Sequence, residues 1–197
     1  MKKQSAIRGR LWALAAVALL GTVAAEAAVA PLRERTHAVA SHVRWTLFPA
    51  RTLHVGDALP PLAFTGLDGR PFELTPTGGA TVVHVFATWC SECNAELPAF
   101  AAARPELLQR GVRFVDIDQA ESAEKVGAFR QTHPLSPITV IDDTNVTGSV
   151  LGVHMIPSTY VVDAAGRLRA AFIGPMTDDQ RLAMKNLVLS PDVGGKT

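Results

Sequence analysis

The chain has 197 residues, of which 48% are hydrophobic and 19% are charged, and its 19 lysine and arginine residues nearly balance 18 aspartate and glutamate residues. Without residues 1–27 the formal charge is −2, because 15 basic and 17 acidic residues remain, and no basic block is left. Nucleic acid is therefore not an expected partner. The roughly 140 residues that follow the N-terminal region suit a single domain.

The first 30 residues have the pattern of an export signal. A basic segment is followed by an apolar stretch, residues 11–30, which only Glu26 interrupts. Small-x-small sites within this stretch fit removal of a signal peptide, but the stretch is also long enough for one membrane span with the basic flank inside. Residues 1–30 are therefore predicted to be a signal peptide or an N-terminal membrane anchor, and residues 31–54 a tether or a juxtamembrane helix. In either case the remainder is delivered outside the cytoplasm, where disulfide chemistry persists.

Residues 55–190 contain strand patterns that alternate with helix patterns. The predicted elements, in chain order, are strands at 62–65, 71–74 and 80–86, a helix after Cys90, a strand at 112–118, a helix at 121–132, strands at 138–141, 159–162 and 168–173, and a helix from 177 to about 189. Asp68-Gly69 is a hairpin turn signal between the first two strands. This order predicts an α/β sandwich with a mixed sheet, followed by a loose tail at 191–197.

The only two cysteines, Cys90 and Cys93, lie where the buried strand 80–86 gives way to a helix. Cys90 should face the free N–H groups of the helix N-terminus, which lower a thiol pKa from about 8.5 into the range of about 3.5–7.5. Cys93, one turn further on, is placed to attack a mixed disulfide at Cys90. Half of a zinc site and a structural disulfide are the alternatives. A zinc site would need further ligands such as a second cysteine pair, and the sequence has no other cysteine. A disulfide that closes so short a loop removes little entropy from the unfolded chain.

Three segments carry motifs that resemble one family. They are residues 86–98, Phe-Ala-Thr-Trp-Cys-Ser-Glu-Cys-Asn-Ala-Glu-Leu-Pro; residues 152–163, with Met155-Ile156-Pro157; and residues 121–126, with Phe129. The first resembles the active site of thioredoxin-like proteins of the membrane-anchored or periplasmic TlpA and ResA type of bacteria. The second is similar to their cis-proline loop, and the third to the helix that this subfamily inserts. The resemblance covers about residues 55–190. It implies a thioredoxin-like α/β/α sandwich with a central mixed sheet and an N-terminal β-hairpin extension.

The resemblance implies a thiol-disulfide oxidoreductase and assigns roles to its residues. Cys90 would be the nucleophile, Cys93 the resolving thiol and Pro157 a cis-proline packed against the disulfide. Glu96 resembles the acidic residue that tunes the cysteines and assists proton transfer, although its position alone fits a solvated helix surface. Trp89, Ile156 and Glu92 are candidate supporting residues. Two positions depart from the family pattern: Glu92, where a proline is frequent, and His84, where an asparagine is common.

His84 lies six residues before Cys90 on the predicted central strand. It is either a core histidine with satisfied hydrogen bonds or a proton acceptor for Cys93. His154 and Met155 are expected near the sulfur atoms, with loop packing as the alternative. Together with Cys90 and Cys93 they would be soft ligands for Cu(I), so a copper carrier is the second functional hypothesis. The oxidoreductase needs no organic cofactor beyond the Cys90-Cys93 disulfide.

By resemblance, the electrons would come from a transmembrane thiol carrier. The targets would be disulfides in exported proteins such as apocytochrome c, in cytochrome c biogenesis, or copper-site assembly factors. The expected location is the periplasm, with a tether to the inner membrane if residues 11–30 are retained.

Ser91 and Glu92 place no cation between the cysteines, while Glu92 and Glu96 bring negative charge. Because negative charge raises the thiolate's pKa and favours the disulfide, a reductant is predicted.

Overall fold

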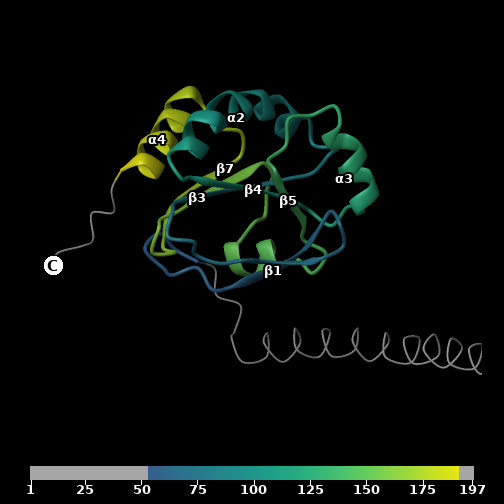
Figure 1. Cartoon of the computed structure of the whole chain (residues 1–197), viewed down its shortest axis with the longest axis horizontal. Coiled ribbons are helices and arrows are strands. Elements are labelled where there is room, and N and C mark those ends of the chain that lie inside the picture. The colour runs from purple at the N-terminus through teal and green to yellow at the C-terminus, as the bar shows by residue number, and fades with distance from the viewer. Residues whose placement is uncertain (1–52, 191–197) are drawn as a thin grey trace, which may run out of the picture. The chain divides into compact units, whose positions relative to one another are not determined.

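Seven strands of the described chain form one sheet in the order β2-β1-β5-β4-β3-β6-β7. The computed structural model describes residues 53–190 (Figure 1). The strands are β1 (Leu62–Gly66), β2 (Pro71–Leu74), β3 (Thr81–Phe86), β4 (Arg113–Asp118), β5 (Ile138–Ile141), β6 (Ser158–Val162) and β7 (Leu168–Ile173). The helical elements are α2 (Ser91–Gln109), α3 (Ala123–Arg130), the π-helical turn η1 (Thr147–Leu151) and α4 (Asp178–Leu189).

The sheet is mixed, as the sequence predicts. Strand β4 pairs in parallel with β3 and β5, whereas β6 runs antiparallel to β3 and β7. The predicted N-terminal hairpin of β1 and β2 joins the sheet through antiparallel pairing of β1 with β5, and Gly69 in its turn has a φ of 76°. All six residues of β3 are buried between β4 and β6, which explains why its sequence is apolar throughout except for Thr81 and His84.

Helices α2 and α4 cover one face of the sheet (Figure 1). Their buried residues form one apolar cluster with β3, β4 and β6, which includes Phe100, Leu107, Met184, Val188, Val82, Phe114 and Val161. The other face packs against η1 and the N-terminal hairpin. Because side chains alternate between the two faces of a strand, His84 shares the α2 face with Val82, and Asp116 and Asp118 share it with Phe114. Three buried ionisable residues thus lie on the face that carries the cysteine helix.

The structure corrects two details of the predicted elements. The helix expected at 121–132 is shorter, because Ser122 is the N-cap of α3 and accepts a hydrogen bond from the Lys125 N–H. Only a polar turn was expected after β5, but the Asp142 carboxylate accepts from the N–H groups of Val146 and Thr147 and is followed by η1. The local pattern of five residues is too short to predict such a turn.

Two predicted segments lie outside the described residues. They are the signal peptide or anchor at 1–30 and the loose tail at 191–197, and the tether at 31–54 is described only from residue 53 onward. Within residues 53–190, no helix combines the length and the apolar character needed to cross a membrane.

Candidate active site

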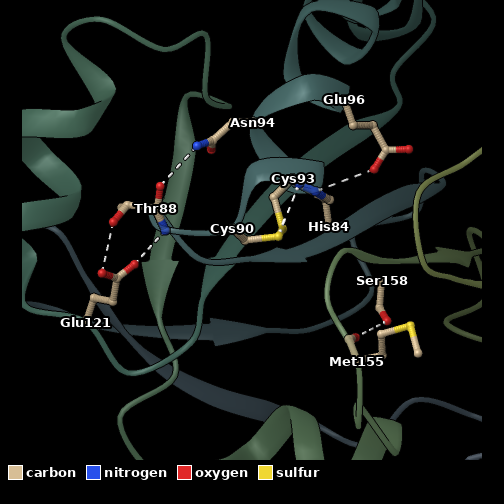
Figure 2. Close-up of a disulfide and its surroundings, with 9 residues drawn as sticks. All are labelled: His84, Thr88, Cys90, Cys93, Asn94, Glu96, Glu121, Met155 and Ser158. Atoms are coloured by element: carbon tan, nitrogen blue, oxygen red, sulfur yellow. Dashed lines mark hydrogen bonds and ion pairs between the residues drawn. A yellow bond between two sulfur atoms is a disulfide. The ribbon is translucent and has the colours of Figure 1, made fainter.

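Cys90 ends the turn between β3 and α2 and is the N-cap residue of α2. Its N–H donates to the Ala87 carbonyl at 3.1 Å, and its Sγ accepts from the Cys93 N–H at 3.2 Å. Cys90 and Cys93 are joined by a disulfide (Figure 2). Cys90 is 7% exposed and Cys93 is 0% exposed. Both cysteines are therefore buried, but Cys90, predicted to be the nucleophile, keeps a small exposed surface, whereas Cys93, predicted to resolve, keeps none.

The loop before β6 carries the predicted proline. The Ile156–Pro157 peptide bond is cis, as the family resemblance implied. Ile156 packs against the apolar cluster that contains both cysteines, and the Pro157 carbonyl accepts from the Gly174 N–H at 2.8 Å. Met155, two residues before the proline, is 53% exposed, and Trp89, just before Cys90, is 68% exposed. Large apolar side chains therefore meet solvent on both segments that flank the disulfide.

Glu96 is buried and faces the sheet, so it is not the solvated surface residue that its position alone would suggest. Its Oε1 accepts from the Met176 N–H at 2.8 Å, and its Oε2 lies 4.0 Å from His84 Nε2 (Figure 2). Neither Oε2 nor Nε2 has a hydrogen-bond partner among the described residues. Burial raises the pKa of Glu96, and the Met176 N–H, His84 and Arg181 offset part of that rise.

Comparison with known proteins places this geometry in a family. A family model described as the AhpC/TSA family matches residues 55–171. The chain belongs to the AhpC/TSA family, a thioredoxin-like family of redox enzymes. The thiol-disulfide oxidoreductase ResA of Geobacillus thermodenitrificans (strain NG80-2) is 28% identical over 126 residues, which cover 64% of this chain and 72% of that protein. The thioredoxin-like protein YneN of Bacillus subtilis (strain 168) is 30% identical over 125 residues, 62% of this chain and 73% of that protein.

Solved structures with the same fold confirm the predicted thioredoxin-like α/β architecture. A putative thiol:disulfide interchange protein DsbE from Chlorobium tepidum has a TM-score of 0.64 at 20% identity and matches 71% of this chain and 100% of that chain. StoA from Bacillus subtilis has a TM-score of 0.55 at 22% identity and matches 66% of this chain and 99% of that chain. Because this chain belongs to the AhpC/TSA family and contains the Cys90-Cys93 disulfide, its function is redox chemistry.

In this AhpC/TSA chain, Asp116 is a site residue that the sequence analysis did not single out. Its Oδ1 lies 3.3 Å from His84 Nδ1, and its Oδ2 accepts from the Ser136 N–H and lies 3.9 Å from Arg104 Nη2. His84 therefore stands between two carboxyl groups, Glu96 on α2 and Asp116 on β4. The available signal was the alternation Asp116-Ile117-Asp118, which puts two acids on one face of a strand whose other residues are mostly apolar.

The Cu(I) hypothesis, with Cys90, Cys93 and His154 or Met155 as ligands, stays a prediction. Within residues 53–190, no group of three or more His, Cys, Asp or Glu side chains is arranged to hold a metal ion. The exposed His154 has its Nδ1 2.9 Å from the Gly152 carbonyl of its own loop, while Cys93 is enclosed. The loop after η1 thus brings one imidazole nitrogen to the backbone. Glu92 is exposed on the first turn of α2.

Proposed function

We propose that this thiol-disulfide oxidoreductase is exported and reduces disulfides in other exported proteins through a Cys90-Cys93 dithiol. The observation that carries the proposal is the Cys90-Cys93 disulfide at the N-terminus of α2, in which Cys93 is fully buried and Cys90 is 7% exposed. Export rests on the sequence pattern of residues 1–30. The names of its relatives, thiol-disulfide oxidoreductase and thiol:disulfide interchange protein, agree with exchange chemistry.

The reaction is two successive thiol-disulfide exchanges. The Cys90 thiolate attacks one sulfur of the substrate disulfide, forms a mixed disulfide and releases the first substrate thiolate. Cys93, as a thiolate, then attacks Cys90 Sγ, which releases the second substrate thiolate and forms the Cys90-Cys93 disulfide. Two electrons pass from the dithiol to the substrate. Another dithiol, by family resemblance that of a transmembrane thiol carrier, must reduce the enzyme again.

Cys93 must lose its proton before it can resolve the mixed disulfide, and Glu96 and His84 are the proposed acceptors. Cys93, Glu96 and Phe100 lie at i, i+3 and i+7 on the buried face of α2. The His84 ring lies 4.9 Å from the Phe100 ring and faces Glu96, so it packs under this same helical face. The unpartnered Nε2 and Oε2 atoms leave room for one proton to be held between them. Asp116 beside Nδ1 orients the imidazole.

The proposed substrates are disulfides presented in extended, apolar segments of exported proteins. Trp89 and Met155 offer apolar surface on the two segments beside the pair, and the backbone of Ile156 adjoins Pro157. The resemblance to the TlpA and ResA type makes cytochrome c maturation or copper-site assembly the two processes to test. The proposed location is the periplasm, with the inner membrane as an anchor if residues 11–30 are retained.

The deciding experiment is partner trapping with the full chain. Cys93→Ser should accumulate mixed disulfides at Cys90 that dithiothreitol releases, whereas Cys90→Ser should accumulate none, because Cys93 is enclosed. Diagonal gels and mass spectrometry of periplasmic and membrane fractions would identify the partners and the location together. Equal trapping by the two variants would contradict the assignment of nucleophile and resolving thiol. Trapped partners that are all cytoplasmic would contradict export.

A further inference from the structure

Thr88, two residues before Cys90, is held by residues from outside its own turn. Its N–H donates to Glu121 Oε2 at 2.6 Å, and its Oγ1 donates to Glu121 Oε1 at 2.9 Å. Its carbonyl oxygen accepts from Asn94 Nδ2 at 3.1 Å (Figure 2). Every polar group of Thr88 is therefore engaged, and two of the three contacts go to one carboxylate.

Glu121 is itself fixed on three sides. It directly precedes Ser122, the N-cap of α3, and its N–H donates to Asp118 Oδ1 at 2.8 Å. Its Oε1 also pairs with Lys125 Nζ, one turn further along the chain. Burial alone would raise the pKa of Glu121, but the hydrogen bonds from Lys125, Thr88 and Asp118 outweigh it, and the pKa lies below its usual range. Glu121 therefore stays ionised and remains a strong acceptor at neutral pH.

The turn from Ala87 to Cys90 is anchored at both ends, because Ala87 and Cys90 are buried in one apolar cluster, and Thr88 lies between them. It contains one internal hydrogen bond, from the Cys90 N–H to the Ala87 carbonyl, and its third residue, Trp89, is 68% exposed. The position of Cys90 Sγ relative to the N–H groups of α2 depends on this turn. The stabilisation that a helix N-terminus gives to a thiolate falls off within the first turn, so a small displacement of Cys90 would weaken it.

We infer that Glu121 is a positioning residue for the Cys90 nucleophile, and that it acts by accepting two hydrogen bonds from Thr88. Glu121 opens the segment 121–126, which resembles the subfamily's inserted helix and leads into α3, so this segment supports the active site although it contributes no reacting atom. This inference rests on the proposed function, because it assigns a purpose to the exact placement of Cys90. It adds a specific link between the end of β4, the start of α3 and the turn that precedes the disulfide.

The test uses Thr88, since its substitution changes no charge. Thr88→Val removes the hydroxyl contact to Glu121, and Thr88→Ser keeps it. The readout is the pH profile of alkylation of Cys90 by iodoacetamide in the reduced full chain, combined with the rate of reduction of a peptide disulfide. Thr88→Val should raise the apparent pKa of Cys90 by up to about half a unit, a part of the helix-terminus effect. It should slow exchange by about tenfold, as loss of alignment at a reacting centre does. Thr88→Ser should match the wild type.

Glu121→Gln provides the second arm, because glutamine keeps an acceptor for the Thr88 N–H and loses the charge. Glu124→Gln is the matched control, as Glu124 is exposed in the first turn of α3, three residues after Glu121. The other ionisable groups on the elements around the pair, Glu92, Glu96, His84, His154, Asp118 and Lys125, are present in all variants. Glu121→Gln removes the carboxylate that pairs with Lys125 and acts on Asp118, whereas Thr88→Val leaves both contacts in place. Glu121→Gln should slow exchange, whereas Glu124→Gln should react at the wild-type rate.

The inference would be overturned if Thr88→Val and Glu121→Gln both kept the wild-type pH profile and rate and only lowered the melting temperature. The hydrogen bonds between Thr88 and Glu121 would then be structural contacts. Failure of the proposed function would look different. In that case the wild-type protein would not reduce disulfides at all, while alkylation would still report the ionisation of Cys90 and its response to Thr88.

Discussion

The polar residues buried beneath α2 are the main departure from an apolar core. His84, Asp116 and Asp118 lie on the one sheet face that also receives Glu96 from the helix. A buried polar atom without a partner costs roughly 1–3 kcal/mol, and both His84 Nε2 and Glu96 Oε2 lack one among the described residues. Natural sequences accept such local costs mainly at functional sites. This cluster next to the cysteine helix is therefore better explained by proton handling than by stability.

Replacement of Glu96 or His84 should change the pH dependence of resolution. Burial raises the pKa of Glu96, so the resolution rate of the wild type should fall towards acidic pH with an apparent pKa above the usual range of a glutamate. This fall should be absent in Glu96→Gln. Resolution should slow by up to about 100-fold in Glu96→Gln and in His84→Asn, as loss of a general base does. Stopped-flow measurement of mixed-disulfide decay across pH checks this. Glu92→Gln is the control, since Glu92 is exposed on the same helix; profiles that all coincide would reduce both residues to structural roles.

Asp118 should make the fold less stable as pH rises through neutrality. Burial first, and then the Glu121 carboxylate, raise the pKa of Asp118 to about 7, against the lowering effect of the Glu121 N–H. An unfolded aspartate titrates near about 3.9, so between these values the folded protein binds more protons than the unfolded one. The stabilisation is complete below the unfolded pKa and is lost as pH rises to about 7.

Asp118→Asn, which mimics the neutral form, should remove this loss. Melting temperatures of the oxidised protein at pH 5 and pH 8 provide the measurement: the wild type should melt at a lower temperature at pH 8, and the variant should show a smaller difference. Glu124→Gln, at an exposed position, should retain the wild-type difference. An undiminished difference in Asp118→Asn would mean that another group titrates in this window.

At the scale of elements, the start of α4 is linked to the site. Thr177 is its N-cap and forms a capping box with Gln180, in which each side chain accepts from the backbone N–H of the other residue. The neighbouring Met176 N–H donates to Glu96. The cap that fixes the first turn of α4 therefore also orients the backbone group that holds the buried glutamate.

Thr177→Ala should lower the free energy of unfolding by about 1 kcal/mol, within the range of about 0.5–2 kcal/mol for loss of an N-cap. Urea unfolding of the oxidised protein, followed by circular dichroism, measures the effect. Thr177→Ser keeps the oxygen that accepts from the Gln180 N–H and should lose much less. Equal stability of the alanine and serine variants would show that the cap contributes little.

At the scale of the whole molecule, the charges around the pair predict the direction of electron flow. Within residues 53–190, the one hydrogen bond to Cys90 Sγ comes from the Cys93 N–H, and no cationic side chain donates a hydrogen bond to either sulfur. Glu92 and Glu96 bring two acidic groups to α2, the helix that carries the pair. Negative charge destabilises a thiolate and so stabilises the disulfide relative to the dithiol.

The Cys90-Cys93 couple should therefore have a midpoint potential of about −200 to −300 mV, on the thioredoxin side of the known range. Equilibration of the full chain against glutathione and dithiothreitol buffers at pH 7 measures it. A value above about −150 mV, nearer to that of strong oxidants, would contradict the proposed reductase and require a source of thiolate stabilisation that these charges do not provide.

Much of the fold was predictable because it depends on local patterns. The apolar run of residues 80–86, the Asp68-Gly69 turn and the Thr177 cap each carry a signal within a few residues, and each element lies where that signal placed it. Boundaries and short elements were less predictable. The π-helical turn η1 depends on the Asp142 carboxylate, which reaches forward to Val146 and Thr147, and no periodic pattern announces it.

The sequence by itself determined that Cys90 and Cys93 stand at a strand-to-helix junction, since their spacing and the flanking patterns are local. Only the tertiary structure decided that Glu96 is buried, that Asp116 stands beside His84 and that Glu121 grips Thr88. The pairs His84–Glu96, His84–Asp116 and Thr88–Glu121 join residues 12, 32 and 33 positions apart in the sequence. The physical reason is that a hydrogen bond or a charge interaction acts over a few ångströms in space, and strand pairing and helix packing set that distance across the chain.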